Sequence, residues 1–232
     1  MGGRGVRRVR RRTGRCPAPA TAGYGNASTT RDCSTTGGVD RNTDADLSFG
    51  ALTARGLGAD YQITAQSGLG MVRNYGGGSP DVDFRTSYDR ASQNGGTWPV
   101  PRTWHPQVVV VGLGINDFST PVGPGERWTP ESLVSAYEEA YHGFLDHLRA
   151  RYGADTTIVV SATAAGGTTT FADSARRVVE EHNRRGDGRV HYWYYDDPRL
   201  DHLGCDWHPS LADHRVISEL LTARLAELPV RW

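Results

Sequence analysis

The chain has 232 residues, enough for one domain with a sizeable hydrophobic core. Its 26 basic and 26 acidic residues give a formal net charge of zero, and its three cysteines are too few for a small disulfide scaffold. The sequence contains no run of 18 apolar residues, which excludes a membrane-spanning helix.

The positive charge is concentrated at the N-terminus. Residues 1–15 hold seven arginines and no acidic residue, whereas the rest of the chain holds 19 arginines against 26 Asp and Glu, a net charge of −7. A central parallel strand rich in arginine is not expected, because unpaired guanidinium groups are very costly to bury. We therefore expect residues 1–16 to pack poorly, at the surface or at a strained sheet edge. This divides the chain into an anomalous leader over 1–20 and a main domain over 21–232.

The main domain shows an alternation of strand and helix patterns. The expected elements, in chain order, are a strand over 60–65, a strand over 108–111, a helix over 129–151, a strand over 157–161, a helix over 172–184, a strand over 190–195 and a helix over 211–228. The four consecutive valines over 108–111 are typical of a strand buried on both faces of a parallel sheet. The sequence therefore predicts a three-layer α/β/α domain with a mainly parallel sheet.

A polar motif follows the run of valines. Residues 112–118 read Gly-Leu-Gly-Ile-Asn-Asp-Phe, at the carboxyl end of a strand, where open α/β sheets bind their ligands. Asn116 in this position can direct its amide N–H at a developing oxyanion, and Asp117 is expected to brace the loop. The alternative is a turn that merely ends the strand.

A second motif lies near the C-terminus, where residues 204–209 read Gly-Cys-Asp-Trp-His-Pro. His208 suits a general base, and Asp206, two residues earlier, suits an acid that fixes the histidine tautomer. The alternative is a loop histidine with a capping aspartate.

Together with the stretches over 21–26 and 67–75, these motifs make the chain similar to the SGNH (GDSL-type) hydrolases. It most resembles the catalytic domain of carbohydrate esterase family 2, whose members remove acetyl groups from plant polysaccharides. The matching stretches read Thr-Ala-Gly-Tyr-Gly-Asn and Ser-Gly-Leu-Gly-Met-Val-Arg-Asn-Tyr. The resemblance covers residues 21–232 and implies the three-layer SGNH fold, acyl-enzyme chemistry, no metal and no cofactor.

The departure from the family lies in its first block, Gly-Asp-Ser-x-Thr-x-Gly-Tyr-Gly-Asn, whose serine is the nucleophile. Alignment of the shared tail places Pro17, Ala18 and Pro19 at the positions of Gly, Asp and Ser. Pro19 has no hydroxyl group, so the nucleophile is missing from this chain. The abrupt start of the family signature at Thr21 favours a reading-frame or start-site change upstream. A nucleic-acid-binding arm and a twin-arginine export signal are weaker explanations, and no apolar segment follows the arginines as an export signal requires.

The resemblance implies roles for the remaining site residues. His208 is the candidate base, and Gly68 and Asn116 are the candidate oxyanion donors. Asp206 is the candidate orienting acid, with a backbone carbonyl as the alternative, because many SGNH enzymes place the Asp three residues before the His and Cys205 occupies that position here.

Substrate contacts are assigned to three further residues. Trp207 is a candidate platform for a sugar ring, and Arg73 and Tyr75 are candidates for the cavity entrance, with a structural ion pair as the alternative for Arg73. The expected partner is an acetylated polysaccharide or oligosaccharide such as xylan or mannan, bound by an extracellular monomer, with no nucleic acid and no membrane as partners. Whether Cys33 and Cys205 form a disulfide is left open.

Three rival functions remain. The Asp and His residues crowded into 201–214 could bind zinc, although no spaced metal motif is present. If the proline at position 19 is genuine, the chain is a carbohydrate-binding pseudoenzyme. Another SGNH activity, lipase or lysophospholipase, is the third rival, and the polar loops without an apolar lid pattern argue against it.

Overall fold

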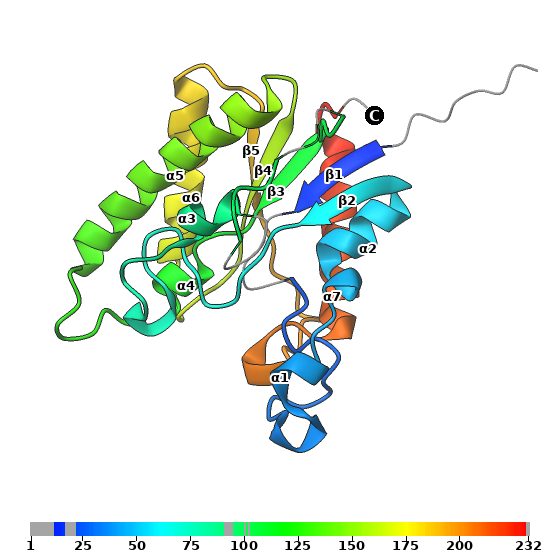
Figure 1. Cartoon of the computed structure of the whole chain (residues 1–232), viewed down its shortest axis with the longest axis vertical. Coiled ribbons are helices and arrows are strands. Elements are labelled where there is room, and N and C mark those ends of the chain that lie inside the picture. The colour runs from blue at the N-terminus through cyan, green and yellow to red at the C-terminus, as the bar shows by residue number, and fades with distance from the viewer. Residues whose placement is uncertain (1–11, 17–21, 91–94, 100, 102, 231–232) are drawn as a thin grey trace, which may run out of the picture.

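Five parallel strands form one sheet, in the order β2-β1-β3-β4-β5 (Figure 1). The computed structural model describes residues 12–16, 22–90, 95–99, 101 and 103–230. The strands are β1 (Arg12–Cys16), β2 (Ala59–Ile63), β3 (Val108–Val111), β4 (Thr157–Ala162) and β5 (Val190–Tyr194).

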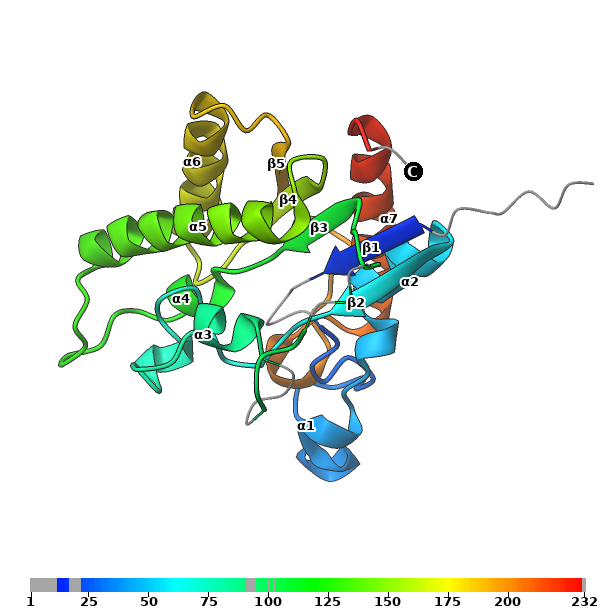
Figure 2. The same ribbon diagram turned by 45° about the horizontal axis from the view of Figure 1, so that its top comes forward.

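Helices cover both faces of the sheet. The α-helices are α1 (Gly38–Arg41), α2 (Phe49–Gly56), α3 (Phe84–Tyr88), α4 (Ile115–Phe118), α5 (Pro130–Tyr152), α6 (Thr170–Arg184) and α7 (Leu211–Glu227). Helices α5 and α6 lie on one face, and α2 and α7 lie on the other (Figures 1 and 2). Short 3-10 helices occur at Ser34–Thr36, Ala45–Leu47, Tyr75–Gly77 and Cys205–Trp207. The predicted three-layer α/β/α architecture is confirmed.

The central strand β3 explains why both faces need helices. Val109 and Val111 belong to the hydrophobic cluster beneath α5 and α6, whereas Val108 and Val110 belong to the cluster beneath α2 and α7. All four side chains are buried, as the run of β-branched residues predicts. The longer predicted elements agree with the structure to within one or two residues at each end.

Helix α5 shows how the sequence sets these boundaries. The Thr129 side chain accepts the Ser132 N–H, the Ser132 hydroxyl bonds back to Thr129, and Pro130 occupies the first helical position. The predicted stripe at 3.6-residue spacing is buried along the whole helix and consists of Leu133, Tyr137, Ala140, Phe144 and Leu148.

Strand β1 differs from the expectation for the N-terminal segment. Its backbone pairs with β2 along Arg12–Cys16 and with β3 at Gly14 and Arg15, so it occupies an interior position of the sheet and not an edge. The prediction that residues 12–16 would lie outside the sheet or at its edge is therefore wrong. Backbone N–H and C=O groups can pair whatever the side chains of their residues, and an empty position between β2 and β3 would leave β2 without a partner and one side of β3 unpaired. The rest of the leader, including Pro19, lies outside the described residues.

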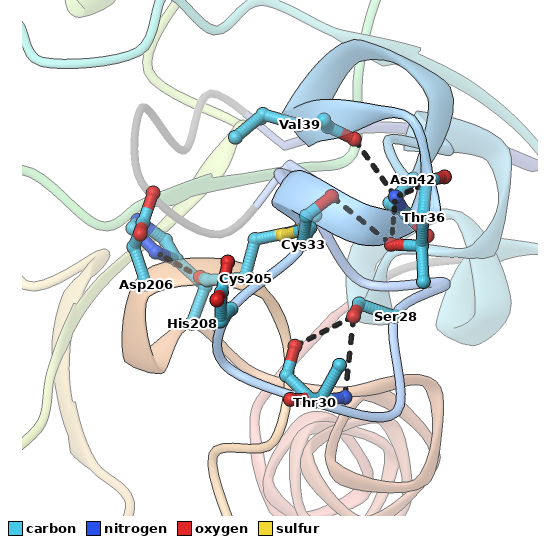
Figure 3. Close-up of a disulfide and its surroundings, with 12 residues drawn as sticks. Ser28, Thr30, Cys33, Thr36, Val39, Asn42, Cys205, Asp206 and His208 are labelled. Carbon is cyan, nitrogen blue, oxygen red and sulfur yellow. Dashed lines mark hydrogen bonds between the residues drawn. A yellow bond between two sulfur atoms is a disulfide. The ribbon is translucent and has the colours of Figure 1, made fainter.

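A disulfide joins two segments that are far apart in the sequence. Cys33 and Cys205 are bonded across 172 residues, with Cα atoms 5.6 Å apart (Figure 3). The segment that contains α1 lies beside the loop that precedes α7 in Figures 1 and 2. Gly25, with φ at +58°, makes this approach possible, because a Cβ atom there would lie 2.3 Å from the Cys205 Cβ.

The described helices include none whose length and apolarity would allow it to cross a bilayer.

Candidate active site

A cavity of about 650 Å³ opens where the strands end at their carboxyl termini. Segments that follow β2, β3, β4 and β5 contribute to its wall, together with the loop before α7. Six of the seven predicted site residues line it: Gly68, Tyr75, Asn116, Asp206, Trp207 and His208. The seventh, Arg73, does not.

His208 is held in the tautomer that a general base requires. Its Nδ1 atom lies 2.9 Å from the carbonyl oxygen of Cys205 (Figure 3). Because a carbonyl oxygen only accepts hydrogen bonds, Nδ1 carries the proton and Nε2 keeps its lone pair. Burial lowers the pKa of His208 from its ordinary value, although the Cys205 carbonyl opposes the shift. The imidazole is therefore neutral at neutral pH and able to accept a proton.

The Asp206 carboxylate makes no hydrogen bond to the His208 ring, which corrects the prediction that it orients this histidine. Its carboxylate accepts a hydrogen bond from the Tyr24 hydroxyl at 3.1 Å. The backbone of Asp206 has φ at 52°, in the left-handed region. This conformation directs the side chain to Tyr24, and the Cys205 carbonyl, the alternative that the sequence left open, takes the orienting position.

Tyr24 supports the histidine from another side. Its ring lies 4.2 Å from the His208 ring, centroid to centroid, at an interplanar angle of 35°. Burial and the bond to Asp206 raise the pKa of Tyr24, so its hydroxyl stays protonated and remains a donor. Tyr24 therefore fixes both the imidazole and the neighbouring carboxylate.

Asn116 and Gly68 stand at the same cavity as predicted oxyanion donors. The buried Asn116 side chain donates from Nδ2 to the Leu69 carbonyl at 2.9 Å, which fixes the plane of the amide. The second N–H of this amide remains available for a ligand. Gly68 has φ at +79°, and no acceptor for its N–H occurs among the described residues.

Asp117 braces the loop that carries Gly68. This fully buried carboxylate accepts the backbone N–H groups of Met71, Val72 and Arg73 at 2.8 to 2.9 Å. Burial raises the pKa of Asp117 to about 6, and the three N–H donors oppose that rise. Gly70 permits this close approach, because a Cβ atom there would lie 2.6 Å from Oδ2 of Asp117.

Arg73 is a structural residue, which corrects its prediction as an entrance residue. Its side chain is 1% exposed and its Nε donates to the Glu126 carboxylate at 2.7 Å. The guanidinium also donates to the carbonyl oxygens of Asp117, Thr120 and Pro121. Arg73 holds the pKa of Glu126 down at about 2. Such a buried cation requires this complete set of acceptors, so none of its donors reaches the cavity.

The two exposed aromatic residues of the cavity fit the predicted binding role. Trp207 is 67% exposed and Tyr75 is 61% exposed, although large hydrophobic side chains are usually buried. Exposed aromatic faces can stack on the apolar face of a sugar ring.

Two members of the Asp and His cluster over 201–214, Asp213 and His214, have structural roles. The Asp213 carboxylate accepts the N–H groups of Asp201, His202 and Ser210. His214 accepts the Phe49 N–H on Nδ1, and burial lowers its pKa to about 4. Within the described part of the chain, no three His, Cys, Asp or Glu side chains gather as a metal site.

Sequence reasoning missed two residues of the site. Tyr24 lies in a stretch that resembles the family, so its position was visible but its contact with His208 was not. Arg31, whose guanidinium lies over Trp207, gave no signal, because it is one arginine in a polar loop 176 positions before its partner.

No family model matches the chain, but relatives and solved structures do. A curated acetylxylan esterase / glucomannan deacetylase of Cellvibrio japonicus is 36% identical over 213 residues, which cover 91% of this chain and 58% of the relative. This chain thus spans little more than half of that relative's length.

Two solved structures have the same fold over nearly the whole chain. One is a carbohydrate esterase whose active site is described as displaying "divergent catalytic and non-catalytic binding functions"; its TM-score is 0.88 at 34% identity, over 97% of this chain and 68% of that chain. The other is a family two carbohydrate esterase from Clostridium thermocellum in complex with cellohexaose. Its TM-score is 0.80 at 30% identity, over 93% of this chain and 64% of that chain.

Proposed function

The chain belongs to carbohydrate esterase family 2, within the SGNH hydrolases, and from this premise we propose that it acts on O-acetyl esters of xylan or mannan. The observation that carries the proposal is the composition of one cavity. A neutral, oriented histidine, two candidate oxyanion donors and two exposed aromatic rings all line it.

Each residue has a separate role in the proposed reaction. His208 Nε2 takes the proton of the attacking hydroxyl group, while Nδ1–H stays bonded to the Cys205 carbonyl. Asn116 and Gly68 donate N–H groups to the oxyanion of the tetrahedral intermediate. Asp117 holds the Gly68 loop in place and does not react.

The hydroxyl group itself is the missing part. Pro19 stands at the family's serine position and supplies neither a hydroxyl nor a backbone N–H for the oxyanion. We propose that the chain as written is nearly inert towards acetyl esters, and that it becomes active when the family's first block is restored.

Two further observations support the proposed substrate and the proposed location. Trp207 and Tyr75 offer stacking surfaces for sugar rings, and the described Clostridium thermocellum relative was solved with cellohexaose. The Cys33–Cys205 disulfide supports an extracellular location, because disulfides persist in oxidising compartments.

Restoration of the block tests the proposal. The triple variant Pro17→Gly, Ala18→Asp, Pro19→Ser supplies the nucleophile, and the measurement is acetate release from acetylated xylan and acetylated glucomannan. We expect a gain of at least about 1,000-fold over the unaltered chain, because loss of the nucleophilic serine alone lowers kcat by up to about 10⁶-fold in a serine hydrolase.

Two control variants isolate the chemistry. The same block with alanine in place of serine at position 19 restores the backbone but not the hydroxyl, and should remain inert. Addition of His208→Ala to the active triple variant should abolish the gain. Comparable turnover by the unaltered chain would show that the nucleophile lies elsewhere.

A binding-only function is the second candidate, and Pro19 is the observation that favours it. The cavity and its exposed aromatic residues need no nucleophile to bind sugar. In this case the unaltered chain binds xylo- or manno-oligosaccharides, and the restored triple variant binds them but releases no acetate.

A further inference from the structure

Arg31 contacts the predicted sugar platform directly. Its guanidinium carbon lies 3.5 Å from the centroid of the Trp207 ring, within the range of a cation–π contact. Arg31 lies on the segment before α1 and Trp207 lies on the loop before α7, so this contact joins the two segments that the disulfide also joins.

The guanidinium of Arg31 is fixed before any ligand binds. Nε donates to the His202 carbonyl at 3.0 Å and Nη2 donates to the Asp201 carbonyl at 2.9 Å. Two hydrogen bonds from one planar fork set both the position and the plane of the group. The backbone carbonyls of residues 201–202 therefore set the orientation of the Arg31 guanidinium over the Trp207 ring.

Trp207 needs support of this kind. Its φ is 65°, in the left-handed region that is disfavoured for a bulky side chain, and the preceding Asp206 has φ at 52°. At 67% exposed, the Trp207 side chain is not held by core packing. Arg31 supports the loop through its backbone as well, because its carbonyl accepts the Asp206 N–H at 2.9 Å.

We propose that Arg31 is a positioning residue that holds the Trp207 ring at the cavity rim and leaves one ring face for a neutral sugar. The guanidinium covers one face of the indole, so the sugar stacks on the opposite face. This inference rests on the proposed function, in which Trp207 is a carbohydrate platform. Arg31 raises saccharide affinity by positioning Trp207 and does not itself contact the sugar.

The test measures saccharide binding, which does not require the missing nucleophile. Dissociation constants of the unaltered chain, Arg31→Ala, Trp207→Ala and the double variant are measured by calorimetry with xylohexaose, mannohexaose and cellohexaose. We expect Arg31→Ala to weaken binding about 3- to 10-fold, the scale of a partly exposed cation–π contact. In the Trp207→Ala background, the same substitution should change the dissociation constant less than about 2-fold.

Additional variants separate positioning from folding. Arg31→Lys keeps the charge but cannot donate from one planar fork to both carbonyls, so its affinity should be intermediate. Arg215→Ala removes an exposed arginine of α7 and should leave affinity unchanged. Acrylamide should quench the fluorescence of Trp207 more strongly in Arg31→Ala than in the unaltered chain. Trp207→Phe gives the signal of the other tryptophans, which is subtracted. Circular dichroism melts confirm that each variant is folded.

The outcomes distinguish this inference from the proposed function. If the unaltered chain binds saccharide and Arg31→Ala binds it equally well, the role of Arg31 is overturned and the proposed function stands. An equal loss in both backgrounds also overturns the inference, because Arg31 would then contact the ligand itself. Absence of binding by the unaltered chain refutes the sugar platform and the inference with it.

Discussion

The Nδ1 atom of His208 lies 2.9 Å from the carbonyl oxygen of Cys205, and this contact orients the imidazole without a carboxylate partner. A backbone carbonyl orients the ring and sets its tautomer, but supplies no full negative charge to stabilise the imidazolium. The arrangement therefore differs from a Ser-His-Asp triad, in which the aspartate does both. The disulfide at Cys205 and the hydrogen bond from its N–H to the Gly25 carbonyl hold that carbonyl in place.

The first prediction follows from this contact. In the triple variant with the restored nucleophile, Asp206→Asn should lower kcat less than about 10-fold. Loss of the aspartate from a true triad lowers it about 10⁴-fold. The side-chain amide oxygen of the Asp206→Asn variant can still accept the hydrogen bond from the Tyr24 hydroxyl. Steady-state kinetics with acetylated xylan measure the effect, with His208→Ala as the control that abolishes turnover. A loss on the triad scale would mean that Asp206 turns to His208 during the reaction.

The second prediction concerns pH. Burial lowers the pKa of His208, so the neutral base persists below the pH at which an ordinary histidine becomes protonated. For the restored triple variant, kcat/KM should be constant through neutral pH and fall in acid with a midpoint below 6.5. A pH–rate profile measures this midpoint. A midpoint above 6.5 would contradict the buried, neutral histidine.

The structure and the sequence agree best where local patterns carry the signal. The four valines of β3 and the apolar stripe of α5 predict their elements closely, because burial on two faces or on one helical face leaves a periodic trace. The Arg-rich strand β1 leaves no such trace, since its place in the sheet comes from backbone pairing.

The site divides in the same way. Motif spacing located His208 and Asn116, because each lies next to a recognisable element boundary. It could not separate a buried ion pair from an entrance residue at Arg73, nor find Arg31, because both roles depend on contacts between segments distant in the sequence. The side-chain direction of Asp206 depends on a left-handed backbone that no spacing reveals.

The third prediction concerns the disulfide. Cys33 and Cys205 close a segment of 172 residues, for which the chain-entropy model gives about 5 kcal/mol of stabilisation. Cys33→Ala with Cys205→Ala should therefore lower Tm by roughly 10–20 °C in a chain of this length. Thermal melts with and without reductant provide the check. Reductant should lower the Tm of the unaltered chain and leave that of the double variant unchanged.

The fourth prediction concerns Arg73 and Glu126. Arg73→Met should lower the free energy of unfolding by about 3–5 kcal/mol, because it leaves the Glu126 carboxylate without its buried partner. Glu126 has its pKa lowered to about 2, so its ion pair stabilises the fold above pH 4.5 and this contribution is lost as pH falls towards 2. The free energies of unfolding of Glu126→Gln and of the unaltered chain, measured with denaturant, should therefore become equal in acid. Equal stability of Arg73→Met and the unaltered chain would refute the structural role.

The last prediction concerns Asp117, whose carboxylate holds the loop that carries Gly68, the proposed oxyanion donor. Asp117→Asn keeps the shape but leaves one oxygen acceptor for three backbone N–H groups, and its own N–H₂ group faces a donor. In the restored triple variant we expect kcat to fall about 10- to 100-fold with a smaller change in KM, because a displaced oxyanion donor is felt mainly in the transition state. The exposed Asp155→Asn serves as the matched control and should change neither parameter.

The same carboxylate makes stability depend on pH in a direction opposite to Glu126. Because burial raises the pKa of Asp117 to about 6 from an unfolded value of 3.8, the protonated form is favoured in the folded protein. This pKa shift adds to the free energy of unfolding. The added stability is fully present below pH 3.8 and is lost as the pH rises through 6. At 1.36 kcal/mol per pKa unit, it amounts to roughly 3 kcal/mol. The difference in unfolding free energy between the unaltered chain and Asp117→Asn should thus be larger at pH 5 than at pH 7.5. A difference that does not vary between these two pH values would show that Asp117 keeps an ordinary pKa and is reached by solvent.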